Sequence, residues 1–267
     1  MAERGFAVAR LPGFATVAVG VFVCLYLPIV TLVVFSFNGG PSIAVWEGFS
    51  WRWYAVAWQN EAVQDATVRS LVVAASASAI ATTLATLAAL GTTRRPAFKG
   101  RTVIYVMINQ PLMVPEIVTA VALLIFFASI KVATGYQGLG YLIAAHSAFC
   151  IPFAYLPIRA RLEGMDTVLE TAAADLYATP WRTFVHVTLP LLAPGVAAGA
   201  MLAFVISLDD VIITEFVKSA GQDTLPTYML GQLRRAVTPE VNAISTALLA
   251  LTVALLTAFF LLTRTRR

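Results

Sequence analysis

Three carboxylates lie in apolar stretches of this sequence where a charge is costly. Glu116 follows Val114-Pro115 within one stretch, and Asp209 and Asp210 lie near the end of another. A charged side chain at the centre of a membrane-spanning helix costs about 2.5–3.5 kcal/mol on insertion scales. Such carboxylates cap broken helices, pair with basic groups or face a wet interface, or else they line a water-filled path for a cationic solute. We favour the path, because these stretches hold no matching cluster of lysine or arginine.

The neighbours of these carboxylates predict local geometry. Consecutive residues of a helix point about 100° apart, so we expect Asp209 and Asp210 to have different roles. Pro111 and Pro115 precede Glu116 at a spacing of four residues. Each proline removes a helical hydrogen bond, so we expect the helix that carries them to kink or open.

A polar segment between two apolar stretches, residues 162–190, has the pattern of a docking helix. Its apolar residues recur at i, i+3 and i+4 spacing, namely Met165, Val168, Leu169, Ala172, Ala173 and Leu176. Asp166, Glu170 and Asp175 fall on the other face, so we expect a short amphipathic helix over residues 165–178 outside the lipid. A membrane protein that displays such a helix offers a surface to a partner.

Cap signals bound this helix on both sides. Thr167 and Glu170 have the spacing of a capping box, in which each side chain bonds to the other residue's backbone N–H. Pro180 cannot continue the helix, but after Thr179 as N-cap it suits the first position of the next one.

The composition is that of an integral membrane protein. Hydrophobic residues make up 59% of the 267 residues and charged residues 12%, with a mean hydropathy of +0.81. Six apolar runs reach the roughly 20 residues that a spanning helix needs; they lie near residues 14–37, 67–90, 102–130, 137–158, 188–213 and 242–263. We therefore expect an all-α protein of six transmembrane helices in one domain over residues 1–267. Its first helix is expected to be retained, and its longest inner loop covers residues 159–187.

Basic residues divide unequally between the two sides of these helices. Twelve of the 18 fall on one side: Arg4, Arg10, Arg94, Arg95, Lys99, Arg101, Arg159, Arg161, Arg182, Arg264, Arg266 and Arg267. The richer side is expected to be cytoplasmic, which places both termini inside the cell. The net charge of +4 then reflects membrane topology and is no sign of nucleic-acid binding.

The first outer loop is rich in aromatic residues: Trp46, Phe49, Trp51, Trp53, Tyr54 and Trp58. We interpret them as an aromatic belt at the membrane–water interface. The alternative is a contact for an extracytoplasmic partner, and both roles are compatible.

Several chemical signatures are absent from the sequence. There is no G-x-x-x-x-G-K-[ST], so we expect no nucleotide site in this chain. Neither His146 nor His186 belongs to an H-E-x-x-H motif, which favours hydrogen-bonded structural roles. No metal or cofactor site and no catalytic residue are therefore predicted.

A family resemblance appears at the docking segment. Glu170-Thr171-Ala172-Ala173-Ala174-Asp175-Leu176-Tyr177, followed by Val187-Thr188-Leu189-Pro190, resembles the EAA loop of permease subunits in binding-protein-dependent ABC importers. Other segments resemble the second permease of spermidine/putrescine importers: Tyr26-Leu27-Pro28, Ser36-Phe37-Asn38, Trp46-Glu47-Gly48-Phe49, Ser207-Leu208-Asp209-Asp210 and Pro239-Glu240-Val241-Asn242-Ala243. The EAA loop is specific to ABC importers, whereas the last two segments point to polyamines less specifically.

Two residues depart from the family's pattern. Thr171 stands where the loop usually has glutamate, and Tyr177 where it usually has glycine. If Tyr177 must adopt a positive φ there, its backbone is strained.

The resemblance implies a type I ABC importer permease in a bacterial inner membrane. Its expected partners are a second, paralogous permease, a dimer of ATP-binding subunits, an extracytoplasmic solute-binding protein and membrane lipid. The residues implied in ATPase coupling are Val168, Leu169, Glu170, Thr171, Ala172, Ala173, Asp175, Leu176 and Tyr177. Glu116, Asp209 and Asp210 then belong to the path of a cationic solute such as spermidine or putrescine.

Other readings of the sequence remain. The same importer class could carry an amino-acid derivative, a phosphonate, thiamine or iron. A proton-coupled secondary transporter would use the three carboxylates as proton relays, but the sequence has no visible internal repeat. An intramembrane hydrolase is disfavoured because no G-x-S-x-G motif is present.

Overall fold

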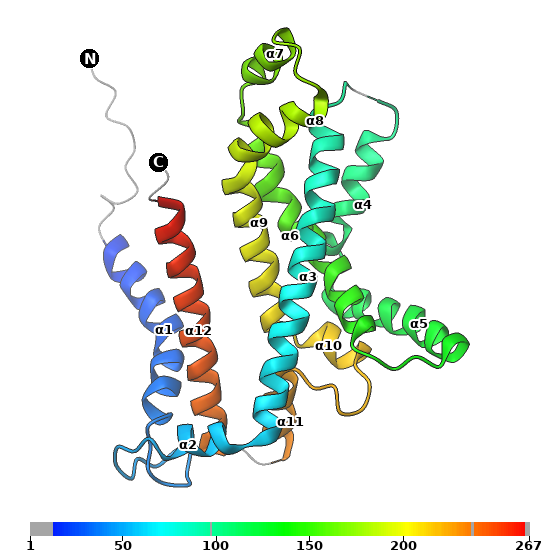
Figure 1. Ribbon diagram of the computed structural model, residues 1–267. Coiled ribbons are helices and arrows are strands. Elements are labelled where there is room, and N and C mark those ends of the chain that lie inside the picture. The colour runs from blue at the N-terminus through cyan, green and yellow to red at the C-terminus, as the bar shows by residue number, and fades with distance from the viewer. Residues whose placement is uncertain (1–12, 97, 236–237, 265–267) are drawn as a thin grey trace, which may run out of the picture. The chain divides into compact units, whose positions relative to one another are not determined.

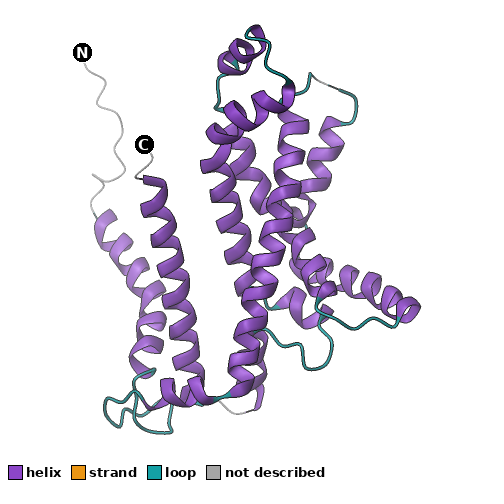
Figure 2. Cartoon of the chain, viewed as in Figure 1, coloured by secondary structure: helices purple, strands orange, loops and turns teal. Residues whose placement is uncertain are grey.

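The computed structural model describes residues 13–96, 98–235 and 238–264. Within these residues the chain is built of helices, without a strand longer than one isolated bridge between Asn38 and Phe49 (Figures 1 and 2). The helices are α1 (Phe14–Phe35), α2 (Arg52–Gln59), α3 (Glu61–Thr93), α4 (Arg101–Met113), α5 (Glu116–Thr134), α6 (Gly140–Glu163), α7 (Val168–Asp175), α8 (Pro180–Thr183), the π-helical turn η2 (Phe184–Thr188), α9 (Leu189–Asp209), α10 (Ile212–Val217), α11 (Leu225–Arg235) and α12 (Pro239–Arg264). Four of the basic residues that predict orientation, Arg4, Arg10, Arg266 and Arg267, lie outside the described residues.

Six helical segments of the described chain are long and apolar enough to cross a membrane, which confirms the predicted all-α, six-helix class. They are Ala15–Phe35, Glu61–Thr93, Glu116–Thr134, Gly140–Glu163, Pro180–Asp209 and Pro239–Leu261. The third predicted run, 102–130, is in fact two helices, because Val114 and Pro115 have extended backbones with ψ of 137° and 133°. The expected opening at the prolines is thus confirmed, although Pro111 itself lies within α4.

The chain forms two compact units, and the first comprises residues 1–61 and 231–251. In this unit α1 runs beside the first half of α12, where Asn242 faces the stretch from Leu27 to Phe35 (Figure 1). The loop after α1 is ordered by the buried Asn38 amide, which donates to the carbonyls of Ser42 and Val45 at 2.8 and 2.7 Å.

The aromatic residues of this loop pack on one another while several keep a face open. Phe37 stacks against Phe49 and meets Trp51 edge to face, with ring centroids 5.3 and 4.8 Å apart. Trp46, Phe49, Trp51 and Trp58 are all exposed. Exposed rings next to a spanning helix are what an interfacial belt requires.

The second unit, residues 62–230 and 252–267, has its core where α6 packs along α9. Two glycines on α9 permit this close approach. A Cβ on Gly199 would lie 2.7 Å from the carbonyl oxygen of Ala154, and one on Gly195 would lie 2.6 Å from Cβ of Arg161. The pair has the small-xxx-small spacing that brings membrane helices into contact.

Helix α3 contributes a stripe of fully buried alanines to the same core: Ala74, Ala77, Ala81, Ala85 and Ala89. Ser78 on this helix donates a hydrogen bond of 2.7 Å to the Ala200 carbonyl of α9. Small side chains let helix backbones come close, so van der Waals contact and interhelical hydrogen bonds hold the unit together.

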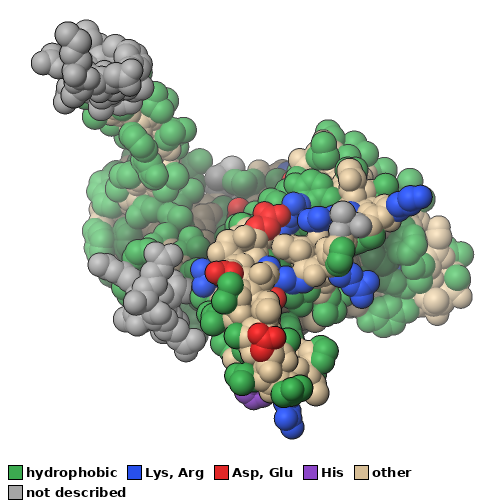
Figure 3. Space-filling model, turned by 90° about the horizontal axis from the view of Figure 1, so that it is seen from above, with side chains coloured by type: hydrophobic (Ala, Val, Ile, Leu, Met, Phe, Trp, Pro, Cys, Tyr) green, Lys and Arg blue, Asp and Glu red, His purple; other side chains and the backbone are tan. Residues whose placement is uncertain are grey.

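Basic side chains gather at the end of this unit that carries α7 and the connection between α3 and α4. Figure 3 views that end and shows lysine and arginine side chains spread over it, with acidic side chains among them. Arg159 stacks over the ring of Tyr105 at 4.5 Å, and Arg161 donates to the Leu191 carbonyl at 3.0 Å.

Candidate functional site

The predicted aspartate pair lies at a corner where α9 ends and α10 begins. Asp210 has an extended backbone, with ψ of 132°, which ends α9 at Asp209. Its carboxylate turns back to cap α10, since Oδ1 accepts from the Ile213 N–H at 3.2 Å. Oδ2 accepts from both the N–H and the hydroxyl of Thr214, at 2.9 and 2.8 Å. Asp210 is therefore buried and engaged within the protein.

The other two carboxylates have different surroundings. Asp209 is exposed, while Glu116 is half-buried as the first residue of α5, beside Pro115 as N-cap. Glu116 lies near enough to Asp210 for the two carboxyl groups to influence each other, and Asp209 is influenced by Asp210 next to it in the chain. Among the described residues, neither Glu116 nor Asp209 forms an ion pair with lysine or arginine. The structure thus brings Glu116 to the corner and separates the two aspartates.

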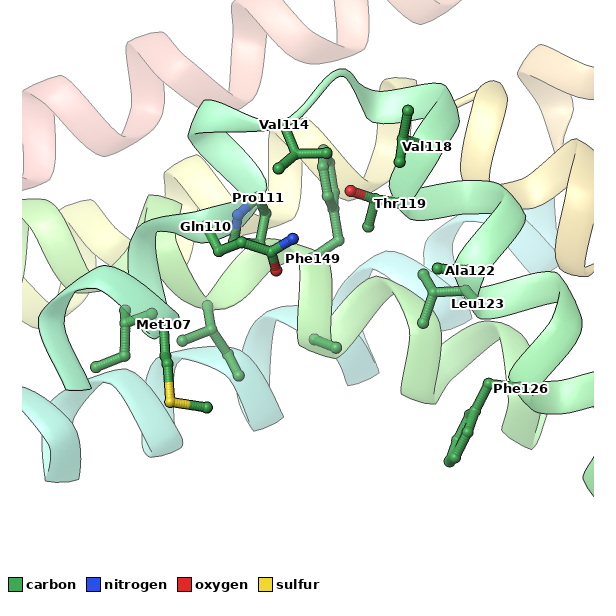
Figure 4. A pocket seen from close by; sticks show the side chains of 13 residues that line it. Met107, Gln110, Pro111, Val114, Val118, Thr119, Ala122, Leu123, Phe126 and Phe149 are labelled. Carbon is green, nitrogen blue, oxygen red and sulfur yellow. The ribbon is translucent and has the colours of Figure 1, made fainter. Parts of the chain in front are cut away.

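An apolar cavity of about 540 Å³ lies beside the break between α4 and α5. Its lining comes from α4, α5 and α6, with Gln110 and Thr119 as the polar exceptions (Figure 4). The Thr119 hydroxyl is buried without a hydrogen-bond partner in the described chain. Glu116 is not part of this lining, so the cavity and the carboxylate corner are adjacent along α5 but separate.

The two histidines are both hydrogen-bonded, as predicted. His146 on α6 is buried, with Nδ1 2.8 Å from the Ser207 hydroxyl and Nε2 2.9 Å from that of Thr214. The Asp210 Oδ2 atom lies 3.4 Å from the same Nε2. The Nδ1 atom of His186, in the turn η2, lies 3.0 Å from the carbonyl oxygen of Arg182.

The docking segment folds as predicted in its centre but is capped differently. Helix α7 covers Val168–Asp175 only, and the capping-box prediction is wrong. Thr167 has helical backbone angles and its side chain caps nothing; the Asp166 carboxylate instead accepts from the Val168 N–H at 2.9 Å. The next helix starts as predicted, with the Thr179 hydroxyl accepting from Arg182 N–H before Pro180.

Glu170 is turned toward the protein and does not extend freely from α7. Arg94, just past the end of α3, places its Nε 3.3 Å from both carboxylate oxygens. Thr188 of η2 donates to the same carboxylate at 3.0 Å. One side chain of the docking segment therefore joins the ends of two long helices, which is why it is not free to reach Thr167.

Tyr177 occupies the left-handed region, with φ of 59°, so the condition for backbone strain at this position is met. It is the only non-glycine residue of the described chain with a positive φ, and its ring is 96% exposed. Other predicted coupling residues are exposed too, namely Val168, Leu169, Thr171, Ala172, Asp175 and Leu176, while Ala173 is half-buried. The outer surface of α7 is thus largely apolar and has no partner within the described residues.

Three features of the site were not predicted from the sequence. The Gly195/Gly199 contact has a recognisable signal in its four-residue spacing. The links from Arg94 to Glu170 and from His146 to the corner have none, because their partners lie 76 and 61 to 68 residues away.

These observations define a class: a six-helix membrane protein with charged groups beside a broken helix and an exposed apolar docking helix at its basic end. The chain belongs to the family described as binding-protein-dependent transport system inner membrane component, whose sequence profile matches residues 81–265. It is 37% identical over 245 residues to the putrescine transport system permease protein PotI of Escherichia coli, covering 91% of this chain and 87% of PotI.

A second relative belongs to the same type. The spermidine/putrescine transport system permease protein PotC of Haemophilus influenzae is 36% identical over 244 residues, covering 91% of this chain and 93% of PotC. The chain is accordingly a binding-protein-dependent permease that is similar to those of polyamine importers.

Solved structures with this fold confirm the architecture. A bacterial ABC transporter that imports the acidic polysaccharide alginate superposes with a TM-score of 0.73 at 13% identity, over 94% of this chain and 93% of that one. The methionine ABC transporter MetNI gives a TM-score of 0.58 at 18% identity, over 78% and 99%. At such identities the likeness shows the fold alone.

Proposed function

We propose that this chain is the transmembrane permease subunit of an ABC importer that moves a small cationic solute inward, a polyamine such as putrescine or spermidine. The observation that carries the proposal is the similarity to two polyamine permeases over about nine-tenths of each chain. The carboxylate corner supports it, because a cation leaving water needs compensating charge where the dielectric is low.

The proposed path places its negative charge on two helices. Asp209 and Glu116 face the solute, and Asp210 holds the corner from behind. Binding in a transport path must be weak and distributed so that the solute also leaves. Carboxylates at separate places suit that need better than one tight cage does.

The driving force comes from other subunits in this proposal. The chain has no nucleotide-binding motif, so ATP is hydrolysed on a dimer of separate subunits, and this chain is not an enzyme. A paralogous permease completes the path, and an extracytoplasmic binding protein delivers the solute. The whole chain acts as one permease domain in the inner membrane, with both termini and α7 on the cytoplasmic side.

Uptake by the assembled transporter in vesicles tests this proposal. The permease pair, the ATPase and the binding protein are reconstituted, and entry of labelled putrescine is followed with and without ATP. We expect ATP-dependent uptake that spermidine competes and that thiamine, a phosphonate and an amino-acid derivative do not. Uptake driven by a proton gradient without ATP, or a preference for an anionic solute, would contradict the proposal.

A further inference from the structure

The buried ring of His146 joins both sides of the corner that carries Asp209. Its Nδ1 contacts the hydroxyl of Ser207 in the last turn of α9, at 2.8 Å, and its Nε2 contacts that of Thr214 in α10, at 2.9 Å. The ring itself belongs to α6, the helix that packs along α9. A single side chain of the core therefore holds the segments before and after Asp209.

The available hydrogens determine which nitrogen of the His146 ring is protonated. The Thr214 hydroxyl has one hydrogen and gives it to Oδ2 of Asp210, at 2.8 Å. Its oxygen must then accept from His146, so Nε2 is the ring nitrogen that bears the hydrogen. The chain of contacts runs from His146 through Thr214 to Asp210, whose carboxylate also receives two backbone N–H groups of α10.

We infer that His146 is a positioning residue that sets the direction of the Asp209 carboxylate, acting through Ser207 on one side and Thr214 and Asp210 on the other. The backbone changes from helical at Asp209 to extended at Asp210, and the Asp210 carboxylate caps α10 directly after that turn. The contacts of His146 add a restraint from α6 on both sides of the turn. The importance of His146 for transport rests on the proposed function, whereas its effect on the geometry of residue 209 does not.

A cysteine reporter at the corner measures that geometry directly. Asp209→Cys is placed in a Cys24→Ser, Cys150→Ala background, and its rate of reaction with a small cationic thiol reagent is measured in membranes. His146→Leu removes both contacts at similar volume, and His146→Gln retains one donor and one acceptor. Because a lost hydrogen bond is worth about 0.5–1.5 kcal/mol net, we expect the leucine variant to change the rate by about twofold to twelvefold and the glutamine variant to stay close to the parent.

Two controls separate local positioning from general damage. His186→Leu alters the other histidine, which hydrogen-bonds to the Arg182 carbonyl, and is expected to leave the rate at residue 209 unchanged. A reporter at Tyr177→Cys, exposed on the docking segment, is expected to react equally with and without His146→Leu. Equal changes at both reporters, or none at residue 209, would overturn the inference.

A second pair of variants covers the case in which His146→Leu is not recovered from membranes. Thr214→Val removes the hydroxyl that links His146 to Asp210 while the backbone cap remains, and Thr214→Ser retains that hydroxyl. We expect valine, and not serine, to change the rate at residue 209; the same rate in both would refute the inference. Uptake assays of Asp209→Asn report separately on the proposed function, because they do not depend on His146.

Discussion

At the scale of single residues, the two adjacent aspartates show how one turn of backbone separates two tasks. The Asp210 carboxylate accepts hydrogen bonds from three donors of α10, while Asp209 remains exposed. When a buried hydrogen-bond acceptor is replaced, its donors are left unsatisfied and the protein loses stability. An exposed carboxylate can be neutralised with little effect on the structure.

The first prediction contrasts neutral replacements at these two positions. Asp210→Asn turns one acceptor oxygen into a donor facing donors, so we expect the free energy of unfolding to fall by about 1–3 kcal/mol. Asp209→Asn is expected to lower polyamine uptake while leaving the melting temperature of the purified complex within about 1 °C, since surface changes usually shift stability little. Thermal unfolding and uptake are measured on the same preparations, and equal melting losses in both variants would contradict this division.

Tyr177 carries the second prediction, because its exposed ring can be removed without adding strain to the backbone. A left-handed non-glycine residue costs about 1–2 kcal/mol, and an aromatic ring buries about 150–250 Å² when it docks. Tyr177→Gly removes both strain and ring; Tyr177→Asn tolerates the left-handed backbone but lacks the ring. We expect both variants to insert normally and to weaken the coupling of ATP hydrolysis to uptake. Coupling equal to that of the parent in both would show that the ring makes no contact of consequence.

At the scale of elements, one ionic contact and one hydrogen bond of Glu170 join the docking helix to the rest of the second unit, and its outer surface is largely apolar. Glu170 connects α7 to the end of α3 through Arg94 and to η2 through Thr188. The turn η2 continues directly into α9, which ends at the carboxylate corner. A displacement of α7 therefore has a physical route into two spanning helices.

The third prediction tests that route by a double-mutant cycle. Arg94→Gln and Glu170→Gln each break the contact while retaining similar size, so either one should reduce ATP-driven uptake. If the two residues act through each other, the double variant is no worse than the poorer single variant, and the coupling energy in stability measurements is about 1 kcal/mol. Fully additive losses would indicate that Arg94 and Glu170 act independently.

The contact between α6 and α9 supports a fourth prediction. Gly199→Ala places a methyl group against the Ala154 carbonyl, so the helices must move apart, and we expect a loss of about 1–3 kcal/mol in stability. Gly91→Ala is the matched control, because a Cβ there meets nothing within 4 Å. In thermal unfolding, we expect the stability of the Gly91→Ala control to equal or exceed that of the parent. A Gly199→Ala variant as stable as the parent would mean that the helices can separate without cost.

At the scale of the whole molecule, the end of the second unit that carries α7 also carries a gathering of basic side chains (Figure 3). Positive residues concentrate on the cytoplasmic side of membrane proteins. An apolar helix surface at that end would be unfavourable in water unless a partner covered it. Both considerations support the proposal that a cytoplasmic ATPase covers this surface.

The fifth prediction follows the surface of α7 through assembly. Single cysteines at Val168, Ala172 and Leu176 should react with an impermeant reagent from the cytoplasmic side and become protected when the ATPase joins. The chain should also copurify with that ATPase. A cysteine at Trp58, exposed in the outer loop, is the control, and it should react only from the opposite side. Unchanged labelling of all three α7 positions would remove the docking proposal.

Sequence alone determined those features that depend on local composition and backbone chemistry. Hydropathy predicts six helices because a bilayer requires about 20 apolar residues for each crossing. Val114-Pro115 predicts the opening of the third run, since proline and its predecessor leave the helical region. The glycine position of the loop likewise raised the question of a positive φ at Tyr177, and the structure has that φ.

Only the tertiary structure decided which side chains meet. Glu170 has the sequence of a capping residue, but a charge 76 positions away, on Arg94, draws it inward. The same holds for Asp210, whose Oδ2 lies 3.4 Å from Nε2 of His146, a residue of another helix. The local sequence pattern determines on which face of its own helix a side chain lies. Its contact partner depends on how separate helices pack, and those helices are far apart in the chain.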